Sequence, residues 1–353
     1  MKAVRTQWAA AGFEAARRVS GPGEPGNGRL HGHSFRVELR TALPDGWGGL
    51  AGVEAHALQH RLQSIVAPFH YGDLNEVLEE PSDLRIVRWI ARRMDLPEPL
   101  RLHLWAGPAR GATLDAAGQG HVWLRDRFEA AHRLPHVPPG HKCGRMHGHG
   151  FEVVLHARAG NELAPDLRTH WQPLRERLHM VCLNDIPGLE IPTSEMLAGW
   201  IWARLAAALP SLSGVTVFET ASCGARFDGR TYRIWKDRSF DSAALLGLGD
   251  VRDPRRRLHG HTYLLRLVLS APLDSLMGWT VDFGDVKALF SPVFQKLDHH
   301  PLHEILPACD VASILDWIRL QSASCLPALQ RIDLRDTPAT GAILSWGGER
   351  RLT

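Results

Sequence analysis

The spacing of apolar positions divides the chain into strands and helices. Apolar and polar residues alternate along Phe151–Leu155, which predicts a strand with one buried face. Pro192-Thr193-Ser194-Glu195 is a typical helix start, and it precedes a predicted helix over Met196–Leu209. A further helix is predicted for Val286–Leu297. Shorter strands are predicted for Val215–Thr220 and Ala225–Phe227, and likewise for Leu100–Ala106 and Arg331–Thr337.

Two short motifs mark the same point in three copies of this pattern. A phenylalanine, an acid and two small residues come first, at Phe13–Ala16, Phe128–Ala131 and Phe240–Ala243. A His-Gly-His triplet follows in each copy, at His31–His33, His147–His149 and His259–His261. The copies are separated by the length of a whole domain rather than of a solenoid repeat, so we interpret them as tandem domains.

Each copy predicts the order strand, strand, helix, helix, strand, strand. An antiparallel sheet with helices on one face follows from that order, which is the α+β class. Short linkers near residues 117–120 and 229–231 indicate that the copies pack directly against one another. We therefore predict three domains, at residues 1–118, 119–229 and 230–353.

Composition narrows the classes of function. The chain has 353 residues, of which 44% are hydrophobic and 22% charged, a globular balance sufficient for more than one domain. The net charge of +3 is small and scattered, so no nucleic-acid partner is expected. No apolar stretch approaches the roughly 20 residues of a membrane span, and the N-terminus lacks the apolar core of a signal peptide. The five widely spaced cysteines fit a reducing cytoplasm, where we expect the protein.

Histidines in the second copy predict a metal site. His147 and His149 are two positions apart in a strand, so their side chains face the same way. His132 ends the preceding strand and reaches the same spot if the two strands pair as a hairpin. Three imidazoles with an open fourth position are the arrangement of catalytic zinc. We therefore predict Zn²⁺ as the cofactor, although neutral imidazoles also bind other divalent metals.

Cys143, four residues before His147, has two interpretations. It is either the fourth ligand of a closed structural site, or a thiolate base beside an open metal site. In the second case the metal, Lys142 and Arg145 would lower the pKa of the thiol. The spacing alone does not separate the two interpretations.

The second copy closely resembles the 6-pyruvoyl-tetrahydropterin synthase family, and within it the 6-carboxytetrahydropterin synthase branch. The resemblance rests on Phe128–Leu134, the Cys143-x-x-x-His147-Gly148-His149 spacing, Leu183–Glu190 and Pro192–Glu195. In the third copy it is strong over Gly278–Phe283 and Leu297–His300, whereas the first copy matches weakly.

That resemblance implies the tunnelling fold, in which trimeric rings of domains form barrels with active sites between subunits. Three ββααββ domains in one chain would then form a pseudo-trimeric ring with an antiparallel inner sheet and outer helices. It also allows a homodimer in which two such rings stack.

The resemblance also implies a set of site residues. A zinc ion is held by His132, His147 and His149, Cys143 is the catalytic cysteine, and Glu219 anchors the pterin ring. The family's Asp-His pair is absent from the second copy, which has His179-Met180 at that position.

The third copy has the opposite pattern. It keeps the Asp-His pair as Asp298-His299, but it has Ala244 for the first histidine and Arg255 for the cysteine. Asp336 stands at its anchor position. The first copy retains almost none of the site: Arg17, Asn27, His70-Tyr71 and Ala106 stand at the four corresponding positions.

Because these losses are complementary, we expect one composite site that takes Cys143 from the second copy and Asp298 and His299 from the third. The implied reaction converts 7,8-dihydroneopterin triphosphate to 6-carboxy-5,6,7,8-tetrahydropterin with release of acetaldehyde and triphosphate, in 7-deazapurine or queuosine-type biosynthesis. Two alternatives are 6-pyruvoyl-tetrahydropterin synthase activity and a catalytically inactive pterin-binding scaffold.

Overall fold

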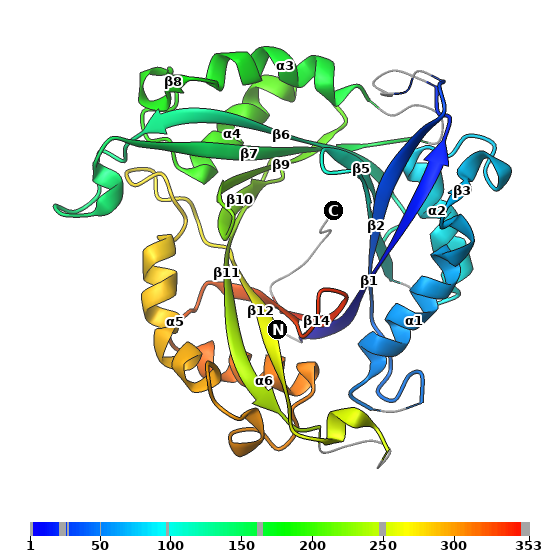
Figure 1. Cartoon of the computed structure of the whole chain (residues 1–353). Helices are drawn as coiled ribbons and strands as arrows, with labels where there is room; N and C mark the ends of the chain where they lie inside the picture. Colours follow the sequence, from blue (N-terminus) through cyan, green and yellow to red (C-terminus); the bar gives the residue numbers. More distant parts are fainter. Residues whose placement is uncertain are drawn as a thin grey trace.

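The sheet of this protein closes on itself. The computed structural model describes residues 3–20, 26, 28–49, 51–96, 99–160, 165–246 and 252–346. Fourteen strands form one sheet, and its last strand, β14 (Thr340–Ser345), pairs with its first, β1 (Val4–Arg17). Figure 1 shows the sheet around a centre, with the helices on its outer side. The long strands are antiparallel, and only the two-residue strands β3 (Gly72–Asp73) and β8 (Val181–Cys182) pair in parallel.

The same element order occurs three times along the chain. The first repeat contains β1, β2 (His31–Thr41), α1 (Glu54–Val66), α2 (Asp83–Met94), β4 (Leu100–Ala106) and β5 (Arg110–Leu114). The second contains β6 (Gly120–His132), β7 (His147–Arg158), α3 (Leu167–Leu178), α4 (Ser194–Leu205), β9 (Leu212–Thr220) and β10 (Cys223–Phe227). The third contains β11 (Tyr232–Ala244), β12 (His259–Leu269), α5 (Phe283–Leu297), α6 (Val311–Ser322), β13 (Leu329–Arg335) and β14.

The predicted α+β class and its antiparallel sheet are confirmed. The helix predicted over Met196–Leu209 begins two residues earlier, at Ser194, where Thr193 accepts a cap hydrogen bond from Met196 N, and it ends at Leu205. Within the described ranges, no helix is both long and apolar enough to cross a bilayer.

Each repeat buries its own apolar core between its helices and its strands. The three clusters of buried side chains fall almost entirely within one repeat each. The phenylalanine of the repeated motif stacks on an aromatic ring of the neighbouring strand in every case. These stacked pairs are Phe13–Phe35, Phe128–Phe151 and Phe240–Tyr263, with ring centroids 4.8, 5.2 and 4.9 Å apart. The motif is therefore a packing signal that holds the first hairpin of each repeat.

The repeats are joined by strand pairing at three equivalent seams. β5 pairs with β6, β10 with β11 and β14 with β1. A glycine on one side of each seam pairs with a tryptophan on the other, namely Gly111 with Trp123, Gly224 with Trp235 and Gly341 with Trp8. A Cβ atom added to Gly224 would lie 2.3 Å from Val217 O and 2.6 Å from the Trp235 ring. The glycine therefore gives the indole room to lie across the seam.

Replacing this glycine tests how tightly the second and third repeats are joined. Gly224→Ala is expected to lower the free energy of unfolding by about 1–3 kcal/mol, because the added methyl group overpacks the contact with Trp235. Urea denaturation followed by tryptophan fluorescence measures the change. Gly160→Ala is the matched control, since a Cβ atom there meets nothing within 4 Å. An unchanged midpoint for Gly224→Ala would contradict this account of the seam.

Candidate functional site

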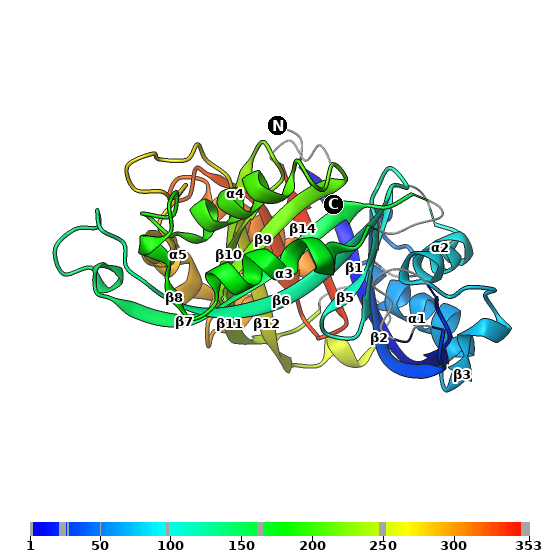
Figure 2. The same cartoon turned by 90° about the horizontal axis from the view of Figure 1, so that it is seen from above.

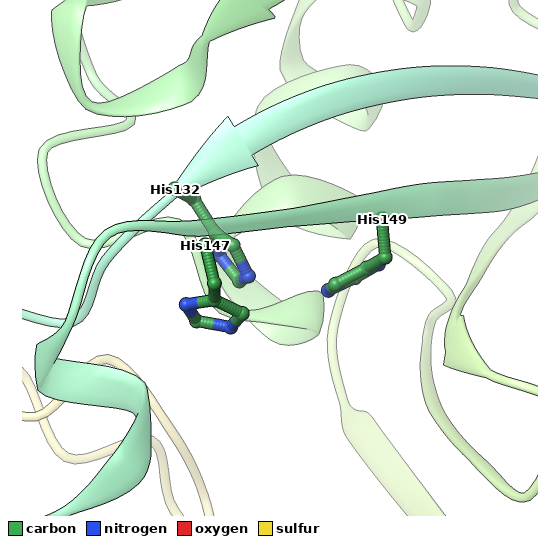
Figure 3. Close-up of side chains that lie close together, drawn as sticks. All are labelled: His132, His147 and His149. Atoms are coloured by element: carbon green, nitrogen blue, oxygen red, sulfur yellow. The ribbon is translucent and has the colours of Figure 1, made fainter.

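The β6–β7 hairpin brings three histidines together. Its register places His132 opposite His147, and His149 opposite Ala130. One ligand atom from each of the three histidines lies within 4.8 Å of the others, and in the part of the chain that the structure describes this is the one such group found. Figure 3 shows the three rings converging from the two strands. The predicted convergence is therefore confirmed.

Backbone carbonyls set which ring nitrogen of each histidine is free. The Nδ1 atoms of His132, His147 and His149 lie 3.1, 2.8 and 3.3 Å from the carbonyl oxygens of Pro192, Arg145 and Gly150. A carbonyl only accepts, so each Nδ1 carries the proton and each Nε2 keeps its lone pair. Such carbonyl contacts to the far nitrogen are usual for metal-binding histidines.

The remaining chemistry of these histidines also fits a metal ion. His132 Nε2 is buried and has no hydrogen-bond partner, which is costly unless another ligand is bound. Burial lowers the pKa of His132 to about 4, and burial also lowers the pKa of His149, so both imidazoles are neutral near pH 7. Neutral imidazoles are the form that binds metal.

Cys143 lies beside this group without belonging to it. It sits in a single 3₁₀ turn, Lys142–Gly144, and its sulfur is not among the ligand atoms within 4.8 Å of one another. That arrangement favours the open site over a closed one with four protein ligands. Burial raises the pKa of the Cys143 thiol, and the charge of Glu219 raises it further, whereas Lys142 lowers it. In the metal-free protein, burial and Glu219 therefore outweigh the lowering of the Cys143 pKa that was expected from the basic neighbours.

Glu219, near the end of β9, shares this environment. Burial raises the pKa of its carboxyl group to about 7, and the nearby carboxylates Glu195 and Asp282 add to the shift. A carboxyl group with such a pKa changes its charge within the physiological range, which is common for groups at functional sites.

The third repeat closes the site from the other side of the seam. Thr280 donates two hydrogen bonds to Glu195 Oε1, from its backbone N at 2.9 Å and from its hydroxyl at 3.1 Å. Thr193 Oγ1 donates to the carbonyl of Gly278. Sequence reasoning gave no role to Glu195 or Asp282, although both lie in motifs that it had singled out. Residues of the second and third repeats therefore meet at this seam.

Asp298 and His299 are not brought to Cys143 within one chain, which corrects the composite site expected from the sequence. His299 Nδ1 lies 3.1 Å from Asp298 Oδ1, so the pair itself is formed. However, Asp298 follows the C-terminal end of α5, whereas the N-terminal end of this 15-residue helix faces the Cys143 turn. At 1.5 Å per residue the two ends of this helix are roughly 22 Å apart, so the end that carries Asp298 lies away from the Cys143 turn.

The position of His299 is nevertheless built in the same way in all three repeats. Tyr71, Met180 and His299 are non-glycine residues with positive φ angles, of 59°, 61° and 59°. Each donates its backbone N–H to the first-hairpin strand of its own repeat, and each side chain is largely exposed. The backbone of the site is thus kept in every repeat, while its side chains differ.

In the first repeat an arginine, Arg17, stands at the position of the first histidine. Arg17 is fully buried, and its Nη1 lies 2.7 Å from Asp83 Oδ1 and donates to Pro81 O at 2.9 Å. Its carbonyl partner corresponds to Pro192, the partner of His132. A permanent cation beside His31 and His33 repels a metal ion, so no metal is expected there. Asn27 lies outside the described residues.

The seam between the third and first repeats is also filled by its own charges. Asp336, at the position of Glu219, lies 3.7 Å from His56 Nε2 of the first repeat. Arg255, at the position of Cys143, forms a two-contact ion pair with Asp253. Because Ala244 replaces the first histidine, this seam lacks the ligand set of the second repeat.

Comparison with known proteins gives consistent matches. The family model described as 6-pyruvoyl tetrahydropterin synthase matches residues 121–230 and 233–345. A 6-carboxy-5,6,7,8-tetrahydropterin synthase from Synechocystis sp. is 42% identical over 119 residues, which are 30% of this chain and 91% of that protein. A dihydroneopterin monophosphate aldolase from Pyrococcus furiosus is 29% identical over 117 residues, 32% of this chain and 97% of that protein. A solved 6-pyruvoyl tetrahydropterin synthase from Caenorhabditis elegans is 19% identical, covers 31% of this chain and 92% of its own, and has a TM-score of 0.29.

The histidine group predicts the metal content of the protein. We expect roughly one divalent metal ion per chain, because only the second repeat has histidines at all three ligand positions. His149→Ala should bring the content close to zero, since two ligands rarely retain a metal. Elemental analysis after dialysis measures it. His33→Ala, the equivalent change in the first repeat, should leave the content unchanged, and an equal loss in both variants would contradict the assignment.

Proposed function

The chain belongs to the 6-pyruvoyl tetrahydropterin synthase family, and from this premise we propose that it is a pterin-forming carbon–carbon lyase. Its substrates would be 7,8-dihydroneopterin triphosphate and one water molecule, and its products 6-carboxy-5,6,7,8-tetrahydropterin, acetaldehyde and triphosphate. The product would enter 7-deazapurine synthesis of the queuosine type, in the cytoplasm. The observation that carries the proposal is the grouping of the three histidines with Cys143 and Glu219 at one seam.

In this proposal residues 1–118, 119–229 and 230–353 are three tunnelling-fold domains in one pseudo-trimeric ring. Three seams exist, but only the seam between the second and third domains keeps the ligand set, the thiol and the anchoring carboxylate. At the other two seams the corresponding positions are occupied by ion pairs, Arg17–Asp83 inside the first domain and His56–Asp336 between the first and third domains.

His132, His147 and His149 would hold a zinc ion through their free Nε2 atoms. Such an ion supplies a Lewis acid for the side-chain oxygens of the substrate and makes the adjacent carbon–hydrogen bond more acidic. The histidines are fixed for this task before any ion binds, because each Nδ1 is already held by a carbonyl group.

Cys143 would accept the proton removed from the substrate. A general base must lie near the bond that it attacks and must be unprotonated. Burial and Glu219 oppose ionisation of the thiol in the metal-free protein. The positive charge of a bound metal acts in the opposite direction, so base and metal are expected to work only together.

Glu219 would anchor the pterin ring. An ionised carboxylate accepts two parallel hydrogen bonds from the neighbouring N–H groups of the ring, in a fork geometry. The partly buried position of Glu219 makes these bonds stronger than they would be in water.

Asp298 and His299 would act on the site of a second chain. The side chain of His299 is 77% exposed, and it lies at the strand ends where the His-Gly-His segments of the ring begin. A homodimer that stacks two rings by these ends would bring the pair of one chain to Cys143 of the other. His299 would then donate a proton to the substrate, held in orientation by Asp298.

Pterin binding should depend on pH through Glu219. The ionised carboxylate accepts the hydrogen bonds, and its pKa is about 7, so affinity should rise with pH. For the metal-free protein we expect roughly tenfold tighter binding of a pterin at pH 8 than at pH 6. Fluorescence titration with the 6-carboxypterin measures this difference. Glu219→Gln should bind weakly at both pH values, and a variant that keeps the full pH dependence would rule out Glu219 as its origin.

The lyase proposal and its two-chain site are tested together by complementation. Cys143→Ala and His299→Ala should each abolish acetaldehyde release from dihydroneopterin triphosphate. If the two chains are refolded or expressed together, half of the dimers are mixed and one of their two sites is intact, so roughly a quarter of the activity should return.

Three outcomes distinguish the parts of this proposal. Lack of activity in the zinc-loaded wild-type chain would overturn the lyase assignment. Full activity of His299→Ala would remove Asp298 and His299 from the site. Two inactive variants that do not complement each other would show that the pair does not act across chains.

A further inference from the structure

A histidine and an aspartate from two different repeats meet beside Cys143. His141 lies two residues before the cysteine, and its Nε2 is 3.8 Å from Oδ2 of Asp282 in the third repeat. Both side chains are mostly shielded from solvent. The teal loop that carries His141 lies at the rim of the ring, on the side of α5, in Figures 1 and 2.

The hydrogen bond from Cys143 to His141 indicates the tautomer of the neutral imidazole. Its Nδ1 accepts a hydrogen bond of 3.2 Å from the backbone N–H of Cys143, so this nitrogen carries no proton. The proton of the neutral ring is then on Nε2, directed at the carboxylate of Asp282. His141 therefore links the backbone of the cysteine to a negative charge on the neighbouring repeat.

The carboxylate of Asp282 is itself held in place. It caps α5, where Oδ1 accepts hydrogen bonds from Gly284 N at 2.6 Å and Asp285 N at 3.1 Å. The two cap hydrogen bonds use Oδ1, and Oδ2 faces His141. One carboxylate oxygen of Asp282 therefore caps its own helix, and the other faces the histidine across the seam.

In the corresponding cap of the second repeat, by contrast, both carboxylate oxygens bond within their own helix. Asp166 caps α3 in the same way, but its Oδ2 accepts a hydrogen bond of 2.7 Å from the hydroxyl of Thr169. In α5 the residue at that place is Asp285, which has no hydroxyl to donate. One oxygen of Asp282 is therefore left for a partner outside its helix.

The segment that carries Asp282 forms further hydrogen bonds with the second repeat. Gly278 accepts from Thr193, and Thr280 donates twice to Glu195. Gly278 has a φ of +72°, and a Cβ atom there would lie 2.9 Å from the Ile191 side chain. The segment from Gly278 to Asp282 thus fits closely against both loops that build the site.

We propose that His141 and Asp282 are a positioning pair that places the Cys143 thiol for proton transfer. The pair acts on the backbone of the cysteine and does not touch the substrate. The contact of 3.8 Å is longer than a hydrogen bond in the ligand-free protein, and such contacts commonly shorten when substrate is bound. This inference rests on the proposed lyase function, and it connects Cys143 to the neighbouring repeat through His141.

Steady-state kinetics of His141→Ala, Asp282→Asn and the double variant test the pair. Asp282→Asn keeps an oxygen for the helix cap, but its amide N–H₂ would face the Nε2–H of His141. Each single change should lower kcat by roughly tenfold or more, with KM nearly unchanged, because a misplaced base slows the chemical step. The double variant should lose no more than one single variant, since the two residues act as a unit.

Asp166→Asn is the matched control, because its cap has no partner across the seam, and it should leave kcat unchanged. Circular dichroism and metal content check that each variant is folded and loaded. Two outcomes would overturn the positioning role. One is a double variant whose loss of kcat is the product of the two single losses, and the other is a change in KM with kcat unchanged.

A second experiment does not depend on catalysis. It measures the rate at which iodoacetamide alkylates Cys143, by peptide mass spectrometry. Freed from the pair, the turn should open more often, so both single variants should react several-fold faster than the wild type and Asp166→Asn. The alkylation rates test the positioning role even if the wild-type chain has no lyase activity. Equal rates in all four proteins would overturn that role.

Discussion

Closure of the sheet is the constraint on which the rest of the molecule depends. Because β14 pairs with β1, the three repeats meet at three equivalent seams and each repeat has a fixed neighbour. A sheet with a free edge would leave a row of unpaired backbone groups exposed to other chains. Closure removes that edge and presses the loops of the third repeat against those of the second. The candidate site exists only where these loops meet, since Glu195 is satisfied by Thr280 of the next repeat.

Covalent linkage of the repeats allows the three seams to differ. In an assembly of identical subunits, a change that fills one site fills all of them. Here Arg17 puts a buried cation where the second repeat has His132, and its pairing with Asp83 contributes to packing rather than to ligand binding. Asp336 is similarly engaged with His56 at the third seam. The seam between the second and third repeats keeps all three histidines, the buried and unpaired Nε2 of His132, and a carboxyl group, Glu219, with a raised pKa. Such features cost stability and are common at functional sites.

Much of the fold and of the candidate metal site could be predicted from local sequence. Strand periodicity and paired motifs indicated the repeated hairpins, and the i, i+2 spacing of His147 and His149 put both rings on one face. His132 joined them because hairpin pairing is a local event. The pKa of Cys143 could not be predicted in this way, since burial and Glu219, far away in sequence, outweigh Lys142 beside it.

The sequence by itself therefore determined the repeated α+β pattern, the family resemblance and the convergence of three histidines, because each depends on residues close together in the chain. Only the tertiary structure decided which residues of different repeats meet. The complementary losses suggested that Asp298 and His299 join Cys143, but α5 separates them because its opposite end lies at the seam. The same helix brings its N-cap, Asp282, to His141 instead. Spacing along a sequence carries no information about which end of a helix faces a neighbouring domain.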